Sequence, residues 1–171
     1  MDLIRFAGLR ETPWANGAGR KADIATGEGW TLAFAWLEGT AAFSDYRGFT
    51  RTITLVEGDG FALGFADRPA LVVARVGEPA TFDGGWPAVC RLLGGPCFVL
   101  NAYSAQGRMR HAVRVEAPGA VSAGDFVVVL RGQVWVGGLS AAPRDTLRIS
   151  APAAVSGSAD ALIAVVRFDP A

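Results

Sequence analysis

The chain has 171 residues, of which 51% are hydrophobic and 19% are charged, and its formal net charge is zero. This length fits one domain or two small fused β units, and an even charge balance argues against nucleic acid as the main partner. No apolar run reaches the ~20 residues that cross a bilayer, and the start Met1 to Arg5 lacks a signal-peptide pattern, so we expect a cytoplasmic protein without a membrane partner.

Short predicted strands follow one another along the whole chain, separated by glycine, proline and other turn residues. They cover residues 3–6, 21–26, 30–37, 49–56, 60–63, 71–75, 80–82, 89–93, 98–101, 109–116, 120–122, 126–136, 145–149, 153–155 and 161–168, with a tight turn inside 126–136. No amphipathic helix of normal length is visible. Many short strands at close spacing indicate an all-β sandwich or barrel.

The first loop with a functional pattern runs from Pro13 to Gly19 and reads Pro-Trp-Ala-Asn-Gly-Ala-Gly. Its small residues would let backbone amides approach a ligand, and Trp14 and Asn16 would add a ring and an amide. An ordinary wide turn is the alternative. The loop is not a P-loop, because the Gly-Lys-Ser/Thr ending is missing.

Two strands carry further candidates. Trp36 shares a strand face with other large residues, which suits the core better than a ligand platform. Arg51 alternates with Phe49, Ile53 and Leu55, so it lies on an apolar face. A charge there needs an anionic or polar partner. Two interpretations stay open: a structural ion pair, or a guanidinium that grips a ligand carboxylate with its planar fork.

Two segments share one layout. Residues 53–63 predict a hairpin around a Glu-Gly-Asp-Gly turn, and residues 126–136 repeat the pattern around Arg131-Gly132. We therefore expect two related β units, 1–108 and 109–171, packed tightly into one compact structure. Cys90 and Cys97 could face each other across a further hairpin, but in a cytosolic protein we expect two reduced, buried thiols.

The chain has strands joined by glycine-bearing turns and followed by Pro-Gly or Gly-Asp. This layout is that of cupin-type (RmlC-like) jelly rolls. More narrowly, the chain resembles the HutD/Ves family of bacterial proteins in three stretches, which occur in family order over the first two-thirds of the chain. Residues 13–19 are like the family's Trp-x-Asn-Gly-Gly-Gly. Residues 43–58 are like its Phe-Ser…Gly…Arg…Gly, and residues 94–101 are like its Gly-Pro…Leu-Asn.

This resemblance implies a double-cupin (bicupin) fold, with two fused β-barrel or sandwich units, in a soluble bacterial protein. In the HutD branch it also implies an association with histidine utilisation, as a regulator that senses a ligand rather than as a pathway enzyme. The chain departs from the family pattern at several positions, among them Ala18, where glycine is usual, and Asp23, where glutamate is usual.

The single histidine, His111, limits the chemistry that we expect. Cupins that bind iron or manganese use two or three histidines and a carboxylate, and no His-x-His is present, so we expect neither a metal nor another cofactor. A serine hydrolase is not indicated, since the Gly-x-Ser-x-Gly motif is missing. The apolar strands around Cys90 and Cys97 should raise the pKa of both thiols.

Three functions remain open. The first is a non-catalytic protein that binds a small organic carboxylate, and we prefer it. The second is a metal-independent isomerase or hydrolase acting on a small organic acid, with Asp23 or His111 as the base. The third is a structural protein that assembles through its apolar strands, for instance as a homodimer. We expect the pocket in the N-terminal unit, where the family-like motifs cluster. The residues expected to bind the ligand are Trp14, Asn16, Trp36, Arg51 and Asn101.

Overall fold

The computed structural model describes residues 1–14 and 17–171, and β-strands dominate it. Within these ranges the helical content is one short 3-10 turn, η1 (Phe6–Gly8), so no described helix has the length and apolar character that a membrane span requires. The structure divides into two compact units. One contains residues 10–110 with 170–171, and the other contains residues 1–9 with 111–169.

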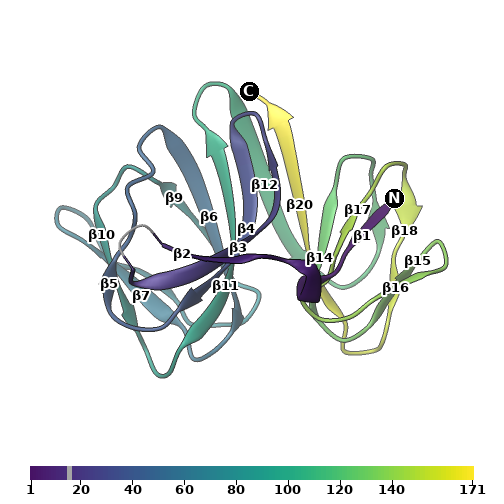
Figure 1. Cartoon of the computed structure of the whole chain (residues 1–171), viewed down its shortest axis with the longest axis horizontal. Coiled ribbons are helices and arrows are strands. Elements are labelled where there is room, and N and C mark those ends of the chain that lie inside the picture. The colour runs from purple at the N-terminus through teal and green to yellow at the C-terminus, as the bar shows by residue number, and fades with distance from the viewer. Residues whose placement is uncertain (15–16) are drawn as a thin grey trace. The chain divides into compact units, whose positions relative to one another are not determined.

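The unit of residues 10–110 contains two antiparallel sheets, and Figure 1 labels all of their strands except β8. The larger sheet has the order β2 (Glu11–Pro13), β3 (Gly19–Gly27), β4 (Trp30–Leu37), β11 (Cys97–Ala105), β6 (Phe49–Glu57) and β9 (Pro79–Asp83). The smaller sheet has the order β5 (Ala41–Ala42), β10 (Ala88–Leu92), β7 (Phe61–Phe65) and β8 (Leu71–Val73). Ile53 and Leu55 from the larger sheet share one core with Phe61 and Leu63 from the smaller one, which makes this unit a β-sandwich.

The second unit has a five-stranded sheet and two small ones. The larger sheet has the order β1 (Asp2–Ile4), β17 (Thr146–Arg148), β14 (Phe126–Arg131), β20 (Leu162–Pro170) and β12 (Met109–Glu116). The small sheets are β13 (Ala120–Val121) with β18 (Ala153–Ala154), and β16 (Leu139–Ala141) with β15 (Val134–Val136) and β19 (Ser156–Gly157). The structural division after residue 110 lies two residues from the predicted one. However, β1 pairs with β17, so the first residues of the chain fold with its C-terminal part.

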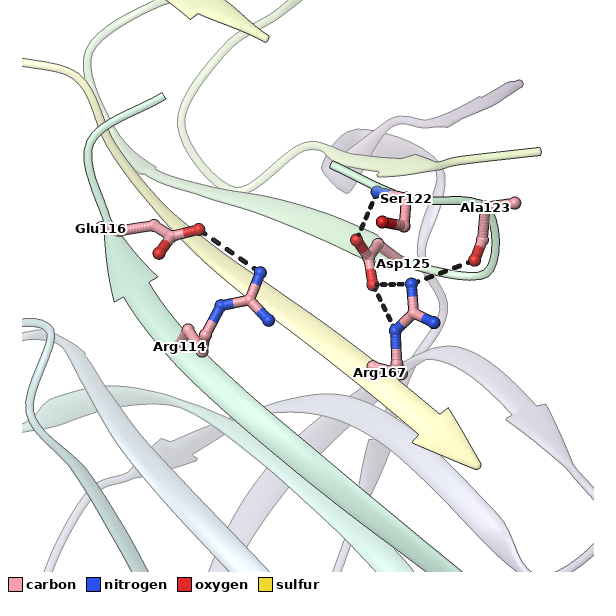
Figure 2. Close-up of polar contacts among 6 residues, drawn as sticks. All are labelled: Arg114, Glu116, Ser122, Ala123, Asp125 and Arg167. Carbon is pink, nitrogen blue, oxygen red and sulfur yellow. Dashed lines mark hydrogen bonds and ion pairs between the residues drawn. The ribbon is translucent and has the colours of Figure 1, made fainter. Parts of the chain in front are cut away.

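The main buried cluster of this second unit consists of valine, leucine, isoleucine and alanine side chains. At its border, the carboxylate of Asp125 is almost fully buried and accepts a hydrogen bond from the backbone N–H of Ser122 at 2.7 Å. The guanidinium of Arg167 reaches the same carboxylate through Nε at 2.8 Å and also donates to the carbonyl of Ala123, as Figure 2 shows. These bonds fix the turn that leads into β14.

The two segments expected to form hairpins are corners between sheets instead. β6 pairs with β11 and β9 in the larger sheet, whereas β7, which follows the Glu-Gly-Asp-Gly turn, pairs with β10 and β8 in the smaller sheet. In the same way β14 pairs with β17 and β20, whereas β15 pairs with β16 and β19. The two segments do share a layout, but each carries the chain from one sheet to the next.

Candidate ligand-binding site

A cavity of about 300 Å³ opens into the unit of residues 10–110. Its wall combines aromatic rings with charged and polar groups from β2, β3, β4, β6, β11 and the loop before β6. The lining residues are Pro13, Trp14, Lys21, Leu37, Phe43, Ser44, Asp45, Tyr46, Arg51, Asn101 and Tyr103. The cavity thus lies in the unit that carries all three family-like stretches.

Arg51 lies at the inner end of this cavity and is only 5% exposed. The strand period places it beside Ile53 and Leu55 on the core face of β6, as predicted. Its Nη2 group donates long hydrogen bonds of 3.4 Å to Oδ1 of Asn101 and to the hydroxyl of Tyr103. Its Nε–H group is buried without a hydrogen-bond partner. None of the described carboxylates forms an ion pair with Arg51. The described residues therefore do not contain the structural ion pair that was one of the two interpretations of Arg51.

Aromatic rings surround the guanidinium of Arg51 instead. Its Cζ atom lies 4.9 Å from the ring centre of Phe43, 5.0 Å from Tyr46, 5.2 Å from Phe82 and 4.9 Å from Tyr103. All four distances are within the range of cation–π attraction. The rings hold the cation in place and keep water away from its faces, while leaving its net charge uncompensated.

Tyr103 and Asn101 come from β11, the neighbour of β6. Burial raises the pKa of Tyr103 to about 12, although the positive charge of Arg51 acts in the opposite direction. The hydroxyl therefore stays protonated at neutral pH and can donate. Asn101 is 2% exposed and uses its carbonyl oxygen for Arg51. Its amide NH₂ is then the group that could donate to a ligand oxygen.

Glycines bring two of the aromatic side chains into position. A Cβ atom on Gly19 would lie 3.0 Å from the Trp14 ring and 2.8 Å from the carbonyl oxygen of Trp36, so the missing side chain lets Trp14 lie against β3. A Cβ atom on Gly84 would lie 2.7 Å from the carbonyl oxygen of Tyr46. Gly84 therefore lets the loop before β6 approach β9, and Tyr46 N–H donates to the Gly84 carbonyl at 3.0 Å.

Two charged side chains lie nearer the cavity mouth. The ammonium group of Lys21 on β3 is 3.0 Å from a carboxylate oxygen of Asp23, which is partly exposed. Asp45 in the loop before β6 is mostly exposed and accepts a hydrogen bond from the backbone N–H of Arg47 at 2.9 Å. Unlike Arg51, both of these groups have an oppositely charged neighbour.

The predicted site residues fall into three groups. Trp14, Arg51 and Asn101 line the cavity together. Asn16 lies outside the described residues. Trp36 is not among the lining residues: it points to the other side of β4, where its ring packs 5.0 Å from Phe98 and lies 4.7 Å from the guanidinium of Arg20.

The groups considered for catalysis are not gathered at the cavity. Asp23 is ion-paired with Lys21, and His111 belongs to the other unit, where burial lowers its pKa to about 4. Cys90 and Cys97 are free, buried thiols, as expected. Burial raises the pKa of Cys90 to about 12 and also raises the pKa of Cys97. Across residues 1–14 and 17–171, no three His, Cys, Asp or Glu side chains are arranged to hold a metal ion.

Sequence reasoning missed Tyr103, Tyr46 and Phe43 as parts of the site. Tyr103 follows Asn101 by two residues on the same strand, but the predicted strand ended at residue 101, whereas β11 continues to Ala105. Had the strand been extended, its period would have placed the Tyr103 hydroxyl beside the Asn101 amide. Phe43 and Tyr46 lie in a loop, where no periodicity indicates which side chains turn inward.

The sequence model of the HutD family matches residues 7–165 of the chain. A protein of Pseudomonas putida, described as an uncharacterised 21.2 kDa protein in the hutC 3′ region, is 32% identical over 120 residues. That match covers 64% of this chain and 61% of the relative, so the comparison spans less than two-thirds of the relative's length.

Solved structures share the whole fold. HutD from Pseudomonas fluorescens SBW25, determined in a formate condition, superposes with a TM-score of 0.83 at 22% identity and covers 99% of this chain and 98% of its own. A conserved protein of unknown function from Pseudomonas aeruginosa PAO1 gives the same values. A cupin 2 conserved barrel domain protein from Leptotrichia buccalis has a TM-score of 0.63 at 9% identity and covers 97% of this chain and 100% of its own. The predicted all-β, cupin-type fold is therefore confirmed.

Proposed function

Because the chain belongs to the HutD family, we propose that it binds a small organic carboxylate without turning it over, and that this binding serves the control of histidine utilisation. The observation that carries the proposal is the state of Arg51. It is a buried cation at the end of a cavity, without an ion-pair partner among the described residues and with an Nε–H group that lacks an acceptor.

A ligand carboxylate would supply what Arg51 lacks. An unpaired buried charge costs several kcal/mol, and a carboxylate offers both a negative charge and acceptor oxygens that match the planar guanidinium. The amide NH₂ of Asn101 and the protonated hydroxyl of Tyr103 lie next to the same point. Together they would hold the second oxygen of the carboxylate and fix its orientation.

The cavity also limits the size of the ligand. Its volume of about 300 Å³ is at the lower end of the range for small-molecule pockets. Its inner end is enclosed by the rings around Arg51, and its mouth carries Lys21 and Asp45. A small acid with a polar group at its far end fits this arrangement, with the carboxylate inside and the polar group near the mouth.

The link to histidine utilisation rests on the relatives. One relative is described by its position beside hutC, and a solved structure of similar fold carries the name HutD. These names support the choice of ligands to test. Histidine-pathway acids such as urocanate and formylglutamate come first, with formate as the smallest carboxylate, since it is named in the condition of that HutD structure.

A thermal-shift screen against these acids, with and without divalent metals, tests the proposal. A ligand that binds only the native state raises the free energy of unfolding by about 2.7 kcal/mol at a concentration of 100 Kd. The melting temperature therefore rises as well. Trp14 lines the cavity, so a change in its fluorescence gives a second readout. We expect a shift with one acid that does not depend on metal and that the matching amide does not cause.

Two variants make the test specific for Arg51. Arg51→Lys should keep the fold but lose binding, because one ammonium group cannot form the bidentate pair. Arg47→Lys is the matched control, since Arg47 lies in the neighbouring loop, is 82% exposed and is not a lining residue. Full binding in Arg51→Lys, or no shift with any acid in the wild type, would contradict the proposal. A shift seen only with metal would favour an enzyme instead.

A further inference from the structure

The inner end of the cavity carries a positive charge that no described side chain of its wall balances. Arg51 supplies this charge, is 5% exposed and keeps one N–H group without an acceptor. Two oxygen atoms beside it, Oδ1 of Asn101 and the hydroxyl of Tyr103, already accept hydrogen bonds from its Nη2 group. The amide is neutral, and so is the hydroxyl, because burial raises the pKa of Tyr103 to about 12. A ligand therefore meets a cation and neutral polar groups at this point.

The negative charge on the wall lies nearer the solvent. Among the described lining residues, Asp45 is the one carboxylate, and its side chain is 62% exposed in the loop before β6. It accepts a hydrogen bond from the backbone N–H of Arg47 at 2.9 Å and lies 3.5 Å from the guanidinium of the same residue. Water and a neighbouring cation therefore screen this carboxylate. The remaining charged lining residue, Lys21, is itself a cation and is paired with Asp23.

This distribution of charge decides which group the α-carbon of a bound acid can carry. In an α-amino acid, an ammonium group is bonded to the carbon next to the carboxylate. With hydrogen bonds of ~2.8 Å and covalent bonds of ~1.5 Å, a carboxylate paired with Arg51 would bring that ammonium to roughly 6 Å from the guanidinium carbon. At an effective dielectric constant of ~20, two unit charges at this distance repel strongly enough to weaken binding about 100-fold.

The aromatic rings of the wall do not offset this repulsion. A ring face attracts an ammonium group as it attracts a guanidinium, but the rings of Phe43, Tyr46 and Tyr103 already surround Arg51, with centres 4.9, 5.0 and 4.9 Å from its Cζ atom. A second cation would have to share these rings with the first. It would also lose its water shell, which is costly for a charged group that gains no opposite charge.

We propose that the cavity selects acids that lack a charged α-amino group, an inference that rests on the proposed binding of a small carboxylate. The accepted ligands carry hydrogen, a hydroxyl, a double bond or an acylated nitrogen at the α-carbon, all of which are neutral. The free amino acid with the same skeleton is excluded. Where such an acid derives from an amino acid, the reaction that supplies it removes or acylates the α-amine.

Sets of acids with a common skeleton test this selection. Imidazolepropanoate, imidazolelactate and histidine differ only at the α-carbon, which carries hydrogen, hydroxyl or ammonium. Glutarate, hydroxyglutarate and glutamate form a second set with a different far end. The hydroxy acid is the matched control, because a hydroxyl has nearly the size of an ammonium group but no charge. Thermal shift and the fluorescence of Trp14, which lines the cavity, measure binding at neutral pH. We expect the two neutral members of a set to bind similarly and the amino acid about 100-fold more weakly.

A pH series separates the effect of charge from the effect of size. When the pH rises above the pKa of the ligand amine, the amino acid loses its ammonium charge. Arg51 stays protonated there, and the Tyr103 hydroxyl, with a pKa of about 12, keeps its proton. The ratio of the two dissociation constants, amino acid over hydroxy acid, should therefore fall toward one. A ratio that stays constant over this pH range overturns the proposal, because size would then exclude the amino acid.

The outcomes at neutral pH distinguish this inference from the proposed function. If histidine and glutamate bind as tightly as the matching hydroxy acids, the selection is overturned, whereas the binding of a small carboxylate stands. If no neutral member of either set binds, the selection is overturned as well. If urocanate, formylglutamate and formate also fail to bind, the proposed function falls with it.

Discussion

Replacing Arg51 by methionine should make the protein more stable and unable to bind its ligand. Methionine has a similar length and no charge, so it can fill the same space among the four rings and remove the buried cation. Stability and binding should therefore change in opposite directions at this one position, which is typical of residues kept for function.

The magnitude follows from the surroundings of Arg51. Burying an ion costs several kcal/mol even after the protein relaxes. Cation–π attraction to each of the four rings offsets about 0.5–1 kcal/mol of this cost. The hydrogen bonds of 3.4 Å are so long that they offset little more. The remainder of about 1–3 kcal/mol is the amount by which Arg51→Met should raise the free energy of unfolding. At about 2–4 °C per kcal/mol for a chain of this size, the melting temperature should rise by several degrees.

Urea unfolding of the ligand-free wild type and Arg51→Met, followed by circular dichroism, measures this difference directly. Repeating both titrations with a saturating carboxylate should stabilise only the wild type. If ligand-free Arg51→Met is instead less stable than the wild type by about 2 kcal/mol or more, Arg51 supports the fold and the reasoning from an uncompensated charge fails.

Four further predictions concern other groups. Gly84→Ala should push the Tyr46 backbone away from β9 and weaken carboxylate binding about tenfold, measured by Trp14 fluorescence. Asp125→Asn should lower the free energy of unfolding by about 2–3 kcal/mol, whereas Glu116→Gln, which affects the exposed pair with Arg114 shown in Figure 2, should cost about 0.5 kcal/mol or less. Cys90, with a pKa of about 12, should react with a thiol reagent at about pH 8 only after unfolding. The pKa of His111 is about 4 in the folded chain and near 6.5 when unfolded. The unfolded chain therefore binds the extra proton between these values, so stability should fall as the pH drops through this range, and less so in His111→Gln.

The face on which Arg51 lies could be predicted because a half-buried strand repeats every two residues. The alternation of Phe49, Arg51, Ile53 and Leu55 is sufficient, and in the structure Arg51 is buried on the strand face that also carries the core residues Ile53 and Leu55. The same rule could not choose between the two faces of β4. Trp36 shares its side with large residues, but the cavity lies on the other side, where Leu37 is a lining residue.

The pairing of strands was harder to predict than the strands themselves. A glycine turn such as Gly58, with φ at 109°, fits a hairpin and also fits a corner that takes the chain to the facing sheet. The choice depends on which strands pair across long distances, such as β6 with β11, and local patterns do not contain that information. The assignment of residues 1–9 to the C-terminal unit depends on long-range pairing in the same way.

Phe43 borders the ligand cavity and also borders a depression on the outer face of the smaller sheet. One phenyl ring is therefore a shared wall between two spaces. If an acid bound in the cavity moves this ring, it changes the shape of the outer depression. Any molecule that fills the outer depression would then change the affinity of the cavity by the same factor as the acid changes the affinity of the depression, because linkage is reciprocal.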